Sequence, residues 1–161
     1  MDLTPIDTEY KGCYFRSRLE ARWAVFFEKM GWDWRYEAEG FKLPSGNYLP
    51  DFYFPELNIY AEVKPRELNK TEFKLAQELT DILCKEKFDV GMLILEGDLD
   101  FKSYRVLQKE GDPLDVIPMP KFDKFYPFFF ASKMDRSYTH ETAQHIKYAR
   151  QARFEFEWKE K

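Results

Sequence analysis

The sequence predicts a single α/β domain in which a mixed β-sheet is flanked by helices on both faces. An amphipathic segment is followed by several short alternating segments, and a second amphipathic segment is followed by a short continuous apolar run. A strand, helix and strand in this order imply a crossover connection within one sheet. The 161 residues suffice for one core, and the 44% of hydrophobic residues argue against disorder.

The first helix is predicted over residues 17–30, where apolar side chains recur at helical spacing. They form one stripe, made of Leu19, Trp23, Phe26 and Met30. Arg18, Arg22 and Lys29 lie on the opposite face of this helix. Gly31 is a natural stop, because glycine accepts the left-handed conformation that often ends a helix.

A meander of strands is predicted next. Residues 32–38 alternate as a strand should, and segments 41–43 and 48–54 are joined by a turn at 44–47, whose Pro-Ser-Gly-Asn sequence is typical of hairpins. A further strand covers residues 58–64, and Pro65 closes it.

The second helix is predicted over residues 68–87, with Asn69 or Thr71 as its cap. The apolar run at 89–95 is typical of a strand that is buried on both faces. The core order is therefore helix, three strands, helix and strand.

The C-terminal part is less regular, because prolines interrupt residues 99–136. We expect two edge strands there, at residues 115–119 and 128–132, and a last helix over 139–158. The core comprises residues 10–95, and residues 96–161 are expected to pack on it as an extension of the same domain.

The most informative pattern is a pair of charged motifs on two adjacent predicted strands. Pro50-Asp51 is followed by Glu62-Val63-Lys64, with eleven residues from Asp51 to Glu62. Because side chains alternate along a strand, Glu62 and Lys64 should share one face while Val63 points into the core.

These residue types suit phosphodiester hydrolysis, which needs an activated water and neutralisation of the phosphate charge. Mg²⁺ supplies both and prefers hard oxygen ligands. Asp51 and Glu62 offer carboxylates, and the backbone carbonyl of Val63 offers a third oxygen. Lys64 would orient the attacking water or stabilise the charge on the phosphate. Glu20 falls at the edge of the apolar stripe, where its carboxylate faces the sheet and can assist a metal.

Each of these acids also has an ordinary structural explanation. Ser17 and Glu20 have the spacing of a capping box, which alone would account for Glu20. Asp51 follows a proline, as turn residues often do. Glu62 and Lys64 can form an exposed pair on a half-buried strand. The coincidence of all three motifs with one order of elements favours a site.

The motifs and their context resemble the PD-(D/E)XK nuclease superfamily, which has the restriction-endonuclease-like fold and the core order αβββαβ. The resemblance covers residues 10–95, and the sequence is similar to small stand-alone members that are common in phages and bacteria. It is carried by Tyr10-Lys11-Gly12, residues 15–23, 36–41 and 48–52, and Glu62-Val63-Lys64. It implies that Asp51 and Glu62 bind the metal, that Lys64 is catalytic and that Glu20 assists the metal.

The expected activity is that of a Mg²⁺-dependent deoxyribonuclease acting by direct water attack, with Mn²⁺ able to substitute. The alternative is a catalytically silent nuclease-fold module that binds nucleic acid or a protein partner. A structural α/β domain without any metal site is a third possibility. A homodimer or a partner protein is compatible with the small size.

The net charge of −4 argues against binding DNA through global charge, but two basic segments flank the candidate acids. They supply the candidate phosphate contacts Arg16, Arg18, Lys70 and Lys74. Ordinary solvated charge is the alternative explanation. The apolar runs are too short to span a bilayer, and Cys13 and Cys84 are isolated, so we expect reduced thiols and a cytoplasmic location.

Overall fold

A computed structural model describes residues 7–86, 91–99, 104–107 and 140–154, which form a mixed α/β fold. Its main sheet has five strands in the order β3-β6-β7-β8-β9. They are β3 (Arg35–Tyr36), β6 (Phe52–Phe54), β7 (Ile59–Lys64), β8 (Gly91–Glu96) and β9 (Tyr104–Leu107). Strands β7 and β8 are parallel and the other neighbours are antiparallel, so the sheet is mixed as predicted.

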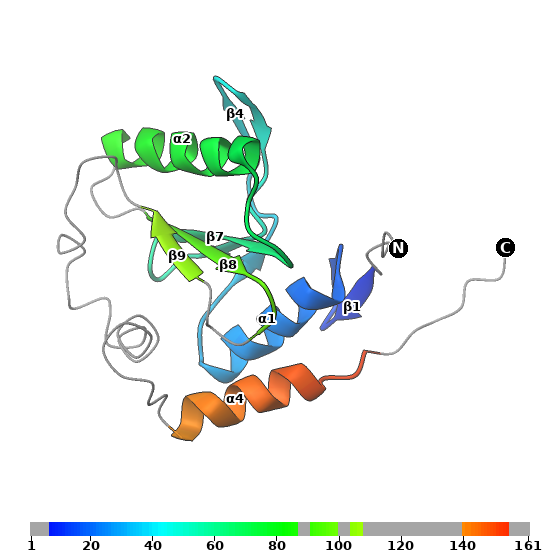
Figure 1. The fold of residues 1–161 in the computed structure, drawn as a ribbon. Coiled ribbons are helices and arrows are strands. Elements are labelled where there is room, and N and C mark those ends of the chain that lie inside the picture. Colours follow the sequence, from blue (N-terminus) through cyan, green and yellow to red (C-terminus); the bar gives the residue numbers. More distant parts are fainter. Residues whose placement is uncertain (1–6, 87–90, 100–103, 108–139, 155–161) are drawn as a thin grey trace, which may run out of the picture.

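Three helices belong to the described part of the chain: α1 (Arg18–Lys29), α2 (Lys70–Glu86) and α4 (His140–Gln151). Helix α2 covers one face of the sheet, whereas α1 lies on the other with α4 packed beside it (Figure 1). In the described helices, no segment is both long and apolar enough to cross a membrane.

Both core helices begin at the caps that the sequence indicates. Ser17 accepts a hydrogen bond of 3.2 Å from the Glu20 backbone N–H. Asn69 accepts from the N–H groups of Thr71 and Glu72, and the Glu72 carboxylate accepts from the Asn69 N–H at 2.8 Å. This reciprocal capping box fixes the start of α2 and selects Asn69 over Thr71 as the cap.

Strand β7 separates the two halves of the core by simple alternation. Ile59, Ala61 and Val63 belong to the aromatic-rich cluster that packs against α1, where Phe27 contacts Trp32, Phe52 and Phe54. Tyr60 belongs to the smaller cluster under α2. Glu62 and Lys64 share the parity of Tyr60, so they lie on the α2 side of the sheet, as the predicted alternation requires.

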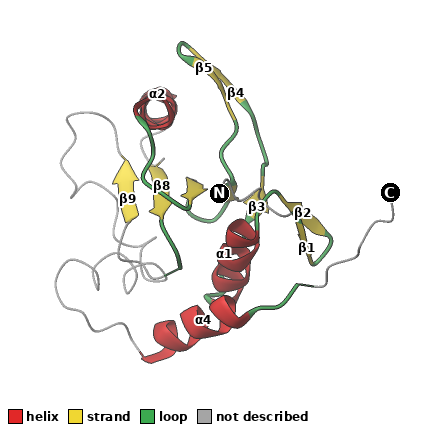
Figure 2. Ribbon diagram, turned by 45° about the vertical axis from the view of Figure 1, so that its right-hand side comes forward, coloured by secondary structure: helices red, strands yellow, loops and turns green. Residues whose placement is uncertain are grey.

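The predicted meander is wrong in its details. Only Arg35–Tyr36 of the segment 32–38 is a strand, and segment 48–54 is not continuous. Of this segment, Tyr48 alone belongs to β5 (Gly46–Tyr48), which pairs with β4 (Phe41–Leu43) in a separate two-stranded hairpin that reaches past α2 (Figure 2). Gly46 and Asn47, which were predicted as turn residues, are therefore strand residues. Pro50 has no N–H to continue the ladder, so the chain leaves β5 and re-enters the main sheet only at β6.

Three further elements differ from the prediction. An unpredicted hairpin joins β1 (Thr8–Tyr10) to β2 (Cys13–Phe15) through Lys11-Gly12, where both residues have positive φ, 51° and 76°. That pattern is typical of a type I′ turn. Strand β9 was also not expected. Helix α4 ends at Gln151, and residues 152–154 are not helical, although the helix was predicted to continue. The predicted strands at 115–119 and 128–132 lie outside the described residues.

Candidate active site

The two charged motifs meet at the junction of β6 and β7. These strands are antiparallel, with Phe52 opposite Ala61, so Asp51 precedes β6 next to the end of β7. The Asp51 carboxylate accepts a hydrogen bond of 2.7 Å from the backbone N–H of Val63. Asp51 is 7% exposed and Glu62 is 4% exposed. The structure therefore brings together the two acids that the sequence analysis selected.

The Glu62 carboxylate has a partner at each oxygen. Its Oε1 lies 2.7 Å from the Lys64 ammonium, whose side chain remains 28% exposed. Its Oε2 accepts a hydrogen bond of 3.0 Å from the phenol of Tyr48, the last residue of β5. Glu62 and Lys64 are therefore not the exposed surface pair of the alternative explanation, because the carboxylate is buried.

The site holds more negative charge than its surroundings stabilise. Burial and repulsion from Glu62 raise the pKa of Asp51 well above its usual value, against the opposing effects of Lys64 and the Val63 N–H. Burial also raises the pKa of Glu62, although Lys64 and Tyr48 favour its charged form. Burial opposes the ammonium of Lys64, but the charges of Glu62 and Asp51 outweigh it and raise the pKa.

Glu20 lies in the first turn of α1 and is 9% exposed. Its carboxylate accepts hydrogen bonds from the Ser17 hydroxyl at 2.7 Å and from the Tyr36 phenol at 2.5 Å. Its negative charge also contributes to the raised pKa of Asp51. Ser17 therefore caps the helix, in agreement with the ordinary structural explanation. Glu20 is nevertheless buried, and its charge acts on Asp51.

The donor set suits a hard divalent cation, although the acids are not gathered into a ready cluster. Within the described residues, no three His, Cys, Asp or Glu side chains are grouped so that they could hold a metal. Asp51 and Glu62 provide two desolvated carboxylates whose repulsion raises the pKa of Asp51, and a cation between them would relieve it. The expected third oxygen, the Val63 carbonyl, and the assistance of Glu20 stay predictions.

The predicted phosphate contacts fall into two groups. Arg16 and Arg18 lie at the start of α1; Arg16 is paired with Glu37 at 2.8 Å, and Arg18 is exposed. Arg16 is also connected to the site through its backbone, because the Arg16 N–H donates a hydrogen bond of 3.1 Å to the Tyr36 phenol.

The second group, Lys70 and Lys74, is exposed on α2. Lys74 lies 3.8 Å from Glu78, a distance at the limit of an ion pair. The first turn of α2 lies near the candidate site, because the charge of Glu72 helps to raise the pKa of both Glu62 and Tyr48, after the larger effect of burial. Lys70 begins that turn, so it is the better placed of the two.

Three residues of the site were not selected from the sequence. Tyr36 and Tyr48 hold Glu20 and Glu62 through their phenols, and no local pattern indicates where a phenol points. Glu96 is 5% exposed, pairs in register with Lys64 across the parallel strands, and accepts the Leu68 N–H at 2.9 Å. Extending the predicted strand 89–95 by one residue would have placed this acid beside Lys64.

No protein-family model matches the chain, and no curated protein matches it. The chemistry and geometry of the site are therefore the basis for its proposed function.

Proposed function

We propose that the protein is a metal-dependent deoxyribonuclease with the restriction-endonuclease-like fold of the PD-(D/E)XK superfamily. The observation that carries this proposal is the junction of the two motifs, where the buried Asp51 carboxylate is fixed to the Glu62-Val63-Lys64 strand by its bond to the Val63 N–H. The order of helix α1, strands β3, β6 and β7, helix α2 and strand β8 also supports it.

The roles follow from the chemistry of each group. Mg²⁺, when bound, activates water and neutralises the charge that builds up on the phosphate. Asp51 and Glu62 would hold the cation with the Val63 carbonyl, and Glu20 would assist from α1. Lys64 is only partly exposed and its pKa is raised, so it keeps its positive charge beside Glu62 and can stabilise an anionic phosphate.

Substrate binding is assigned to the basic residues at the starts of the two helices. Arg18 and Lys70 are the first residues of α1 and α2, and these helices lie on opposite faces of the sheet (Figure 1). Arg16 and Lys74 each have an acidic neighbour, Glu37 and Glu78, whose negative charge weakens the positive potential of the basic side chain. A DNA phosphate would have to replace this neighbour as the partner of the basic side chain.

A second candidate is a catalytically silent module that binds nucleic acid or a protein partner. The observation that favours it is that both carboxylate oxygens of Glu62 already have protein partners, Lys64 and Tyr48. For catalysis, a cation must compete with the Lys64 ammonium. In a silent module, the ion pair between Lys64 and Glu62 would stay intact.

A cleavage assay distinguishes the two candidates. Labelled linear, circular, single-stranded and branched DNA is incubated with the protein in Mg²⁺, Mn²⁺ or EDTA, next to Glu62→Ala and Lys64→Ala. The nuclease proposal expects cation-dependent cleavage by the wild type and none by either variant. DNA binding without cleavage of any substrate would favour the silent module. Neither binding nor cleavage would contradict the nuclease and would leave the silent module only a protein partner.

A further inference from the structure

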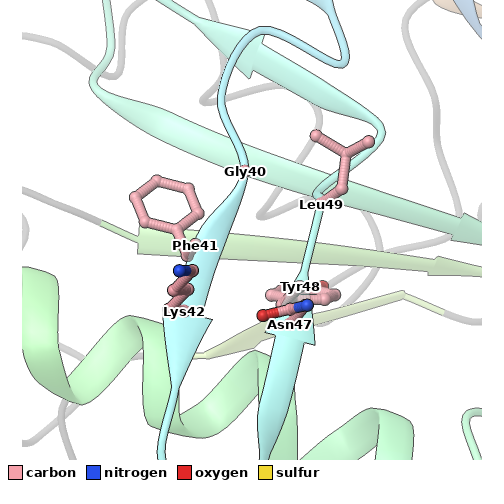
Figure 3. Close-up of a pocket in the computed structure, with 6 residues that line it drawn as sticks. All are labelled: Gly40, Phe41, Lys42, Asn47, Tyr48 and Leu49. Carbon is pink, nitrogen blue, oxygen red and sulfur yellow. The ribbon is translucent and has the colours of Figure 1, made fainter.

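The β4–β5 hairpin carries a residue that reaches the candidate active site. Its inner side chains pack against the apolar cluster under α2, and this inner set consists of Phe41, Leu43 and Tyr48. Tyr48 also lines a groove formed by residues at and next to both strands of the hairpin (Figure 3). The other residues lining the groove are Gly40, Phe41, Lys42, Asn47 and Leu49.

The hairpin is held in place at its tip. Ser45 lies in the turn between the strands, and its backbone N–H and hydroxyl donate to the two carboxylate oxygens of Glu78 at 3.0 and 2.5 Å. Glu78 belongs to α2, so this double contact fixes the tip against the helix. With the apolar inner face packed below it, the hairpin gives Tyr48 one position relative to the sheet.

The phenol of Tyr48 fixes one oxygen of Glu62. The hydroxyl donates to Oε2 at 3.0 Å, while Oε1 faces the Lys64 ammonium at 2.7 Å. Because Glu62 is 4% exposed, few other donors can replace the phenol. A carboxylate held at Oε2 presents Oε1 in a fixed direction, so only the partner of Oε1 has to change when a cation enters.

We propose that Tyr48 is a positioning residue, which orients the Glu62 carboxylate for a divalent cation. This inference rests on the proposed metal-dependent function and names the hydrogen bond that prepares its ligand. Groups that hydrogen-bond to a metal ligand typically change metal affinity about 10-fold to 100-fold when they are removed. Tyr48 itself provides no oxygen to the cation and does not touch the phosphate.

The test measures Mn²⁺ and Mg²⁺ binding by calorimetry to the wild type, Tyr48→Phe and Tyr53→Phe. The matched control also loses one phenol on the α2 side of the sheet, but this phenol contacts Asn58 at 3.2 Å. We expect Tyr48→Phe to bind both cations about tenfold more weakly, and Tyr53→Phe to bind like the wild type. Thermal unfolding of both variants separates this effect from a loss of folded protein.

Cleavage rates add a readout that a purely structural role would not move. With saturating Mg²⁺, Tyr48→Phe should recover the wild-type maximal rate, because only the cation concentration at half-maximal rate depends on the phenol. Wild-type cation affinity in Tyr48→Phe would overturn the inference and leave the proposed function intact. If the wild type itself binds no divalent cation, the proposed function fails and the inference fails with it.

Discussion

The Asp51 carboxylate accepts a hydrogen bond of 2.7 Å from the backbone N–H of Val63. Val63 lies between Glu62 and Lys64, so this one bond joins the two sequence motifs. The donor is a backbone group, and the Val63 side chain packs on the opposite side in the α1 core. The relative position of the two acids is therefore set by the sheet itself and does not require a bound cation.

We expect Asp51→Asn to be more stable than the wild type in EDTA and inactive in Mg²⁺. The amide oxygen still accepts from the Val63 N–H, whereas the buried charge is removed. Burial and repulsion from Glu62 raise the pKa of Asp51 above its usual value of 3.8, so the folded protein binds the proton more tightly than the unfolded chain. The free energy of unfolding of the wild type therefore falls as the pH rises from 3.8, the usual pKa, to the raised pKa of the folded protein. The variant has no carboxylate at this position and does not show that loss.

Thermal unfolding in EDTA at several pH values measures this effect. The advantage of Asp51→Asn should grow as the pH rises above 3.8 and should amount to a few degrees at neutral pH. An equal or lower unfolding temperature of the variant at neutral pH would contradict the repulsion that we infer between the two acids.

Lys64→Met should separate cation binding from catalysis. Methionine keeps much of the side-chain volume but removes the ammonium that competes with a cation for Glu62 Oε1. We expect cation affinity to be unchanged or tighter, and the single-turnover cleavage rate to fall about 100-fold. Lys42→Met, at an exposed lysine of the hairpin, is the matched control. Cleavage by Lys64→Met at the rate of this control would exclude Lys64 from catalysis.

The contact between the β1–β2 hairpin and α1 should contribute less to the free energy of unfolding at acid pH than at neutral pH. Glu28 accepts hydrogen bonds from Lys11 and from Tyr10, the latter at 2.8 Å. The bond from Lys11 is the main cause that lowers the pKa of Glu28 below its usual 4.5. A lowered folded-state pKa gives stability that is present above 4.5 and is lost as the pH falls through the folded-state value.

Urea unfolding at about pH 7 and about pH 3 tests this with Glu28→Gln. The variant should be less stable than the wild type by at most about 1 kcal/mol at neutral pH, since the carboxylate is partly exposed, and the difference should shrink at acid pH. Glu9→Gln, at an exposed carboxylate of β1, is the control. A difference that grows in acid would contradict the sign of the shift.

Lys70 and Lys74 should contact DNA phosphates. Each neutralised phosphate contributes about 0.9 to the slope of log affinity against log salt, so Lys70→Gln and Lys74→Gln should each reduce that slope by roughly one. Lys85→Gln, at an exposed lysine in the last turn of α2, should leave the slope unchanged. Fluorescence anisotropy with a labelled duplex in Ca²⁺ or EDTA measures these slopes, and equal slopes for all three variants would refute the assignment.

The elements that the sequence predicted well have strong local signals. Ser17 and Asn69 cap α1 and α2 through their side chains, so a few neighbouring residues determine where each helix begins. The strand that Pro65 closes and the apolar run of β8 likewise agree with the observed β7 and β8 within one or two residues. Glu62 could be assigned to a strand because it lies within β7.

The elements that were missed depend on tertiary contacts. The segment 48–54 has the composition of one strand, but Pro50 interrupts its ladder and Asp51 turns its side chain toward β7. The hairpin therefore packs on α2 instead of joining the sheet, which brings Tyr48 to Glu62. Neither the register of a short hairpin nor the direction of a phenol can be read from neighbouring residues.

The cleavage rate of labelled DNA as a function of Mg²⁺ concentration, for the wild type and Glu62→Gln, tests the central claim most directly. Glutamine keeps the shape of the side chain and an oxygen for the Tyr48 phenol but removes the charge that holds the cation. We predict no wild-type cleavage in EDTA, a rate that rises and saturates with Mg²⁺, and background rates for the variant throughout. Wild-type cleavage that persists in EDTA, or wild-type rates in Glu62→Gln, would contradict a metal-dependent site at Asp51 and Glu62.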